Sequence, residues 1–147
     1  MAQSINNEEL VMVHTYEIEA GNFTLAGEAA SNIKKLLRQI GIDTKIVRRV
    51  AIAAYETEIN MVIHSVGGIM RLEITPKEIV LKARDDGPGI EDIELAMQEG
   101  YSTATELARE LGFGAGMGLP NIKRCSDKLH IQSELGQGTY LEARFFL

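Results

Sequence analysis

The alternation of apolar and polar residues in the first part of the chain predicts one strand followed by two helices. Residues Leu10 to Glu19 alternate imperfectly, which suits a partly buried strand. Apolar residues then recur at helical spacing from Leu25 to Ile40, and Gly41 is expected to end that helix. Asp43 can cap a second helix that continues to about His64.

The rest of the chain shows two further pairs of alternating segments, and each pair predicts a hairpin. Ile69 to Thr75 and Glu78 to Ala83 flank a short Pro-Lys connection, and Leu129 to Ser133 and Tyr140 to Phe146 flank a Gly-Gln-Gly-Thr turn. Between the hairpins we expect two short helices, Ile93 to Glu99 and Asn121 to Ser126.

Strands that cluster in pairs, instead of alternating singly with helices, favour an α+β fold. We expect a two-layer sandwich with the helices on one face of a mixed sheet and the other face largely open. Residues 1–147 are predicted to form a single domain, with a flexible N-terminus at about residues 1–9 and a mobile Gly-rich loop at about 100–118.

Composition narrows the class of partner and the cellular compartment. The formal net charge of -6 disfavours nucleic acid, because a phosphate backbone is bound through cations. The N-terminus lacks the features of a secretory signal, and no apolar run approaches the length that crosses a membrane. A single cysteine, Cys125, excludes an intramolecular disulfide. We therefore expect a cytoplasmic protein that binds neither nucleic acid nor membrane.

Glu56 and Asn60 are the first residues that suggest chemistry. They lie four positions apart in a predicted helix, so both side chains project from one side. An amide oxygen is a suitable ligand for Mg²⁺, and a neighbouring carboxylate can accept a proton from an attacking hydroxyl. The alternative is a solvated polar strip on an amphipathic helix.

The segment from Asp85 to Ile90 follows a predicted strand directly. Its glycines let the backbone approach a ligand closely, and Asp85 could accept a hydrogen bond from an exocyclic amine such as that of adenine. An ordinary strand-to-helix turn would use the same residue types.

The run from Gly112 to Leu119 places glycine at every second position before a predicted helix. Free N–H groups and the positive end of the helix dipole favour phosphate at such a place. The segment matches neither the P-loop nor the dinucleotide fingerprint, and a flexible surface loop is the alternative.

In combination these segments resemble the GHKL, or Bergerat-fold, ATPase superfamily of histidine kinases, gyrase B, Hsp90 and MutL. Glu56 with Asn60 resembles the N box, Asp85-x-Gly87-x-Gly89 the first Gly box, Gly112 to Gly118 the second, and Gly136-x-Gly138-Thr139 the last. The motifs occur in the family order from about Val50 to Leu147.

Within the superfamily the chain is most similar to the small bacterial serine/threonine kinases of anti-sigma and stressosome switches. Gly100-Tyr101-Ser102-Thr103 and Gly114 to Pro120 resemble the lid and phosphate loop of the stressosome kinases, although Ala104 to Leu111 lengthen the lid. The resemblance implies ATP and Mg²⁺, with Glu56 as general base, Asn60 on the metal, and Asp85 and Thr139 at adenine. It also places the following residues around the nucleotide: Gly87, Gly89, Ile90, Ser102, Thr103, Gly112, Gly114, Gly116, Met117, Gly118 and Leu119.

The resemblance implies transfer of the ATP γ-phosphate to a Ser or Thr of a small STAS-domain partner. An ATP-gated module that sequesters a sigma factor is the competing hypothesis, and an ATPase fragment of a larger GHKL assembly is a third. Oligomeric state is left open, with a homodimer as one candidate. We assign no catalytic role to His64. Lys123 and Arg124 could reach a γ-phosphate or an acidic partner surface, although solvated helix charges are the favoured interpretation.

Overall fold

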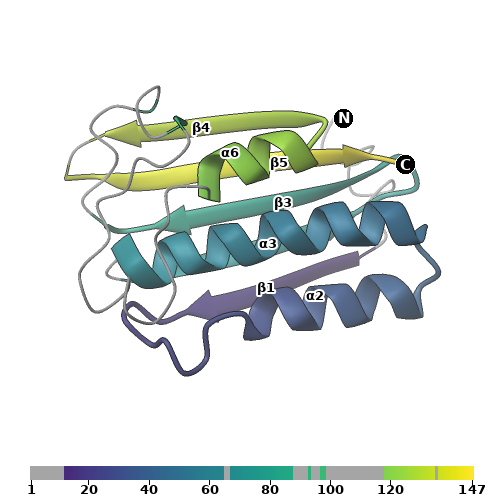
Figure 1. The fold of residues 1–147 in the computed structure, drawn as a ribbon, viewed down its shortest axis with the longest axis horizontal. Coiled ribbons are helices and arrows are strands. Elements are labelled where there is room, and N and C mark those ends of the chain that lie inside the picture. The colour runs from purple at the N-terminus through teal and green to yellow at the C-terminus, as the bar shows by residue number, and fades with distance from the viewer. Residues whose placement is uncertain (1–11, 65–66, 88–92, 94–96, 99–117, 135) are drawn as a thin grey trace, which may run out of the picture.

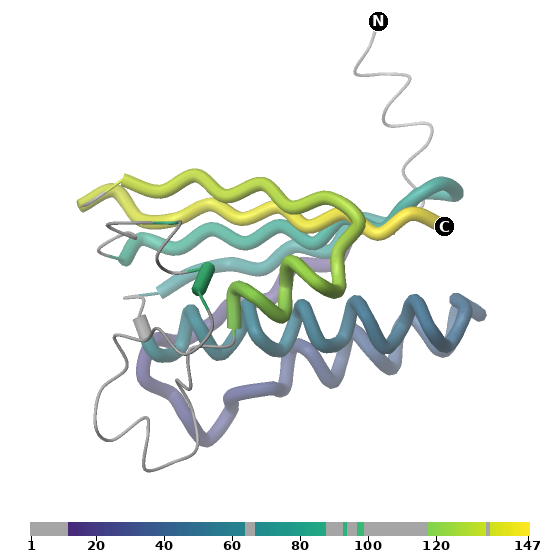
Figure 2. The backbone as a smooth tube through the Cα atoms, turned by 45° about the horizontal axis from the view of Figure 1, so that its top comes forward, coloured from purple at the N-terminus to yellow at the C-terminus, as the bar shows by residue number. Residues whose placement is uncertain are grey.

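The computed structural model describes residues 12–64, 67–87, 93, 97–98, 118–134 and 136–147. They form two layers, with three helices covering one face of a five-stranded sheet (Figure 1). The turned view in Figure 2 separates the helical layer from the sheet. Both the α+β class and the two-layer arrangement agree with the sequence prediction.

The strands follow the order β1-β2-β3-β5-β4 across the sheet. Their bounds are β1 (Met12–Ile18), β2 (Gly68–Ile74), β3 (Glu78–Asp85), β4 (Lys128–Glu134) and β5 (Gly138–Phe146). All four neighbouring pairs of these strands are antiparallel, so the expected mixed sheet is wrong. The alternation of apolar and polar residues shows which side chains face the core, but it is the same in parallel and antiparallel strands. Strand direction is set by the connections between strands, which this pattern does not reveal. The two predicted hairpins are confirmed as β2-β3 and β4-β5.

The two long helices begin and end where local signals predict. Helix α2 (Glu28–Gln39) is followed by Gly41, whose φ of 84° is the left-handed conformation that favours glycine after a helix. Helix α3 (Thr44–His64) begins after Asp43, whose Oδ2 accepts a hydrogen bond from the Lys45 N–H at 3.1 Å.

Helix α6 (Gly118–Cys125) begins three residues before the predicted start at Asn121. Pro120 is in its first turn, where a missing N–H costs no helical hydrogen bond. Gly118 and Leu119 therefore belong to the helix. The predicted helix at Ile93 to Glu99 lies largely outside the described residues, although the Met97 N–H does donate to the Ile93 carbonyl at 3.0 Å.

One apolar core fills the space between the layers. The helices and the inner face of the sheet both contribute fully buried side chains, including Ile33, Leu37, Val50, Leu72, Leu81, Ile122 and Phe145. Among the described residues no helix is both long and apolar enough to span a membrane.

Ionic side chains cover the outer face of the sheet. Lys82 contacts Glu73 at 3.1 Å, and Arg144 contacts Glu78 at 2.9 Å and Glu142 at 3.3 Å. Burial opposes ionisation of Glu142, but the Tyr140 hydroxyl and the neighbouring cations outweigh it and lower the pKa of the carboxyl group. This face thus stays open as predicted.

Candidate functional site

The predicted site residues that the structure describes gather at one end of the molecule. The C-terminal end of α3, the end of β3, the start of β5 and the start of α6 all lie at the left of Figure 1. The helices and the hairpin strands therefore present their termini to a common region.

Glu56 and Asn60 lie one turn apart on α3, and both side chains are half-buried. Helix α6 packs against the same region of α3: the Asn121 Nδ2 donates to Glu56 Oε1 at 3.3 Å. Arg124 Nη1 in turn donates to Asn121 Oδ1 at 3.3 Å. The Glu56 carboxylate is thus held by an amide from α6, which a solvated polar strip would not require.

Gly118, the first residue of α6, comes very close to Asn60. A Cβ atom added at Gly118 would lie 3.0 Å from both the nitrogen and the oxygen of the Asn60 side-chain amide. A side chain here would require that amide to shift, so glycine favours the close approach. The end of the second Gly-rich segment and the Asn-bearing helix are therefore in direct contact.

Asp85 and Thr139, the two residues predicted at adenine, are joined by a hydrogen bond. The Asp85 Oδ1 accepts from the Thr139 N–H at 3.2 Å and from the Gly87 N–H at 3.0 Å. The Thr139 hydroxyl lies 2.8 Å from the Ser133 hydroxyl. These bonds fix the carboxylate at the junction of three strands.

A second glycine permits this junction. Gly138 has a φ of 84°, and a Cβ added there would overlap the carbonyl oxygen of Asp85. The backbones of β3 and β5 can meet so closely only with glycine at this position.

A cavity of about 510 Å³ opens at the strand ends beside Asp85 and Thr139. Its volume falls within the usual range for small-molecule pockets. Polar groups line it, including Ser133, Gln132 and Asp86. The volume and the polar lining of this cavity therefore fit a nucleotide base at the strand ends.

Gly68, the first residue of β2, lies against the end of β3. A Cβ there would lie 2.8 Å from the Arg84 carbonyl oxygen and 3.1 Å from Cβ of Asp85. Glycine at this position therefore permits the close approach of β2 to the strand that carries Asp85. The remaining predicted site residues lie outside the described part of the chain: Gly89, Ile90, Ser102, Thr103, Gly112, Gly114, Gly116 and Met117.

Sequence reasoning missed two residues that support the site. The buried Glu58 carboxylate accepts from the N–H groups of Gly27, Ala29 and Ala30 at 3.0, 3.2 and 2.9 Å, and so caps α2 from α3. Asn121 carried no signal beyond its place at a helix start. Glu58 could have been suspected, because it occupies an otherwise apolar face of the predicted helix.

Two ionisable groups near α3 show shifted pKa values. Burial raises the pKa of Tyr55, and the charges of Glu56 and Glu58 raise it further. Burial likewise raises the pKa of the Cys125 thiol, against the opposing effect of two arginines. A thiol with a raised pKa is a poor nucleophile at neutral pH, so Cys125 is not a candidate for covalent chemistry.

Comparison with known proteins shows the family to which the chain is similar. Residues 21–145 match the family model described as histidine kinase-like ATPase domain. The chain is 30% identical over 114 residues to the serine/threonine-protein kinase RsbT of Bacillus subtilis, covering 75% of this chain and 80% of that protein. It is 33% identical over 139 residues to an anti-sigma F factor of Clostridium acetobutylicum, covering 91% of this chain and 89% of the relative.

A solved structure shares the fold. In the SiaB-SiaC complex from Pseudomonas aeruginosa, the matching chain superposes with a TM-score of 0.55 at 14% identity, covering 100% of this chain and 96% of the other. At this level of identity the likeness concerns the arrangement of helices and strands.

Proposed function

The chain belongs to the histidine kinase-like ATPase domain family, and we propose that it is an ATP-dependent serine/threonine protein kinase acting on a small STAS-domain protein. The observation that carries the proposal is the contact between α3 and α6. It places Glu56, Asn60 and the N-terminus of α6 together, at the same end of the molecule as Asp85 and Thr139. Phosphoryl transfer depends on such positioning more than on covalent protein chemistry.

In this proposal some of the described residues bind adenine and others bind the phosphates and the metal. Asp85 and Thr139 hold the adenine at the strand ends, where the cavity lies. The N-terminus of α6 and the Asn60 amide lie together and would bind the phosphates, and Asn60 would supply a protein oxygen ligand for Mg²⁺. The metal, when bound, neutralises charge on the phosphate oxygens.

Glu56 is proposed as the general base. Its carboxylate accepts the proton of the Ser or Thr hydroxyl as that oxygen bonds to the γ-phosphorus, and the bond to the bridging oxygen of ADP breaks. The bond from Asn121 fixes one carboxylate oxygen, which leaves the other for the incoming hydroxyl.

The relatives support a protein as the phosphate acceptor. One is named a serine/threonine-protein kinase, and the solved structure that shares the fold is part of a two-protein complex. A STAS-domain protein is the acceptor that the resemblance to switch kinases implies.

The experiment compares the wild-type chain with Glu56→Gln, using MgATP and a purified STAS-domain protein. We expect the variant to bind nucleotide with unchanged affinity and to lose phosphorylation by roughly 10²- to 10⁴-fold, the usual contribution of a general base. Glu17→Gln, an exposed change on β1, serves as the control and should behave as wild type. Undiminished phosphorylation by Glu56→Gln would show that Glu56 is not the base.

The similarity to an anti-sigma F factor favours a second function, nucleotide-dependent capture of a sigma factor. Catalysis would then be secondary to binding. Capture of a purified sigma factor in the presence of MgATP, undiminished in Glu56→Gln, would favour this alternative. Failure to capture it, with phosphorylation of the STAS-domain protein intact, favours the kinase.

A further inference from the structure

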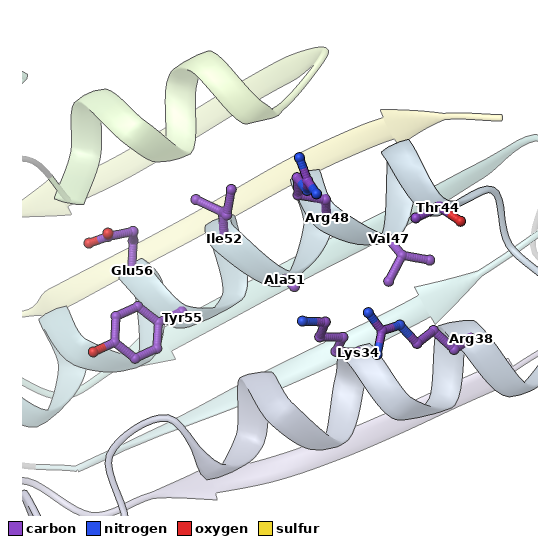
Figure 3. Close-up of a pocket in the computed structure, with 9 residues that line it drawn as sticks. All are labelled: Lys34, Arg38, Thr44, Val47, Arg48, Ala51, Ile52, Tyr55 and Glu56. Carbon is purple, nitrogen blue, oxygen red and sulfur yellow. The ribbon is translucent and has the colours of Figure 1, made fainter.

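A groove of about 300 Å³ runs between α2 and α3 on the outer side of the helical layer, away from the sheet. Figure 3 shows Lys34 and Arg38 extending from α2 toward α3. Glu56, the proposed general base, lines one end of this groove. The groove is therefore continuous with the site where the acceptor hydroxyl must arrive.

Charge distinguishes the groove from the outer face of the sheet. Three cations line it, Lys34, Arg38 and Arg48, and the only acidic side chain among its lining residues is Glu56. None of the three cations forms an ion pair within the described part of the chain, whereas the lysines and arginines on the outer face of the sheet are largely paired. In a chain of net charge -6, this is a local surplus of positive charge.

The groove also exposes apolar surface. Ile52 is 39% exposed and Tyr55 is 40% exposed, and both line it. Aromatic and aliphatic side chains ringed by charges are typical anchors of protein interfaces. The mixture suits a protein segment that carries both apolar and acidic side chains.

The distance along α3 from Arg48 to Glu56 indicates how far a docked carboxylate would lie from the acceptor Ser or Thr. Arg48, Ile52 and Glu56 follow one another at intervals of four residues along one side of the helix (Figure 3). Eight residues of helix span about 12 Å. An extended segment covers the same length in roughly four residues.

From these features we propose that the α2–α3 groove docks an acidic segment of the phosphoacceptor protein. A carboxylate of that segment, roughly three to six residues from the acceptor Ser or Thr, meets Arg48 and Lys34, while an apolar side chain rests on Ile52. The proposal rests on the proposed kinase function, since it uses Glu56 as the point that the acceptor must reach.

The test uses two double charge reversals in the full chain. The groove variant, Lys34→Glu with Arg48→Glu, reverses the charge of two side chains that line the groove. The control variant, Lys35→Glu with Lys45→Glu, makes the same change in net charge at exposed positions of α2 and α3 that do not line it. The probe is a purified acidic STAS-domain protein, with equilibrium binding measured without ATP and phosphorylation measured with MgATP.

We expect the groove variant to weaken equilibrium binding and raise the KM for the STAS-domain protein at least tenfold, because close charge pairs contribute strongly at interfaces. Its KM for ATP and its kcat at saturating partner should change less than twofold. The control pair should match wild type, and added salt should weaken wild-type binding. Equal losses in both pairs, an unchanged KM in the groove variant, or no binding by the wild-type chain would overturn the proposal.

An apolar pair of variants tests the same surface without altering charge. Ile52→Ala should weaken partner binding several-fold, whereas Ile69→Ala, at a 48% exposed position on β2, should not. If partner binding depends on the groove but no phosphorylation is observed, the docking proposal holds and the proposed kinase function is wrong. If phosphorylation occurs and neither groove variant changes it, the kinase function holds and the docking proposal is wrong.

Discussion

Glu58 illustrates how one side chain can hold two helices together. Glu58 is 3% exposed, and its carboxylate accepts hydrogen bonds from three N–H groups at the start of α2. Helix α2 has no side-chain cap of its own, since Gly27 precedes it. Glu58 therefore satisfies helix-start donors that would otherwise be buried without a partner.

The first prediction concerns this cap. Glu58→Gln keeps the shape of the side chain but removes the charge and turns an NH₂ group toward backbone donors. We expect the free energy of unfolding to fall by roughly 2–4 kcal/mol, measured by urea denaturation. Glu28→Gln, an exposed acid in the first turn of α2, should cost less than roughly 1 kcal/mol. Similar losses in both variants would contradict the capping role.

Substitutions at two glycines of the β4–β5 hairpin distinguish the cost of backbone strain from the cost of steric overlap. Gly136 and Gly138 both have positive φ, 81° and 84°, but only Gly138 faces another backbone segment. Gly136→Ala should destabilise the chain by roughly 1 kcal/mol, the cost of the left-handed conformation. Gly138→Ala should cost at least roughly 2–3 kcal/mol, because the new methyl group meets the Asp85 carbonyl. Thermal unfolding measures the difference, and equal shifts would show that the strands do not meet so closely.

At the scale of elements, Arg49 joins α3 to the turn between α6 and β4. Its Nε donates to the Cys125 carbonyl at 2.8 Å, and its Nη2 contacts Asp127 at 3.0 Å. Asp127 also accepts from the Phe146 N–H at 2.8 Å. Through these bonds α6, which carries Gly118 and Asn121 into the site, is fixed to the sheet at its far end.

A pH dependence follows from Asp127. The hydrogen bond from the Phe146 N–H, and then the Arg49 guanidinium, lower the pKa of this carboxyl below its ordinary value. A lowered pKa in the folded state means that the carboxylate stabilises the fold above the unfolded-state pKa, and that this contribution is lost as pH falls through the folded-state value.

Asp127→Asn should therefore lower Tm by about 1–3 °C at pH 7, a small change because the pair is partly exposed. The gap between wild type and variant should close below about pH 4. Calorimetry between pH 3 and pH 7 measures it, with Glu17→Gln as a control. A gap that persists at low pH would contradict the ionic origin of the stabilisation.

The sequence predicted best those elements that are stabilised by contacts between residues close together in the chain. Helices α2 and α3 and both hairpins are fixed by neighbours a few residues away, and their signals were clear. The early start of α6 was missed because a glycine such as Gly118 is unfavourable in an isolated helix. Packing of Gly118 against Asn60 offsets that preference.

For the whole molecule, all described helices and strands contribute to one apolar core. We predict a single cooperative unfolding transition in urea, as is usual for a domain with one core. The chain has no tryptophan and four tyrosines, so far-UV circular dichroism and tyrosine fluorescence are suitable probes. Coincident curves are expected, and two separated transitions would contradict a single core.

The sequence by itself determined the class of fold, the face of each helix and strand that is buried, and the pairing of Glu56 with Asn60. The buried faces and the pairing of Glu56 with Asn60 follow from periodicity within one element, and the class of fold follows from the order of the elements along the chain. Only the tertiary structure decided that the sheet is antiparallel throughout its described strands, that Thr139 meets Asp85 across 54 positions and that Asn121 meets Glu56 across 65. Such contacts are selected by how the layers pack as a whole, and no local pattern encodes them. The basic groove belongs to this second group, because it exists only where two helix faces meet.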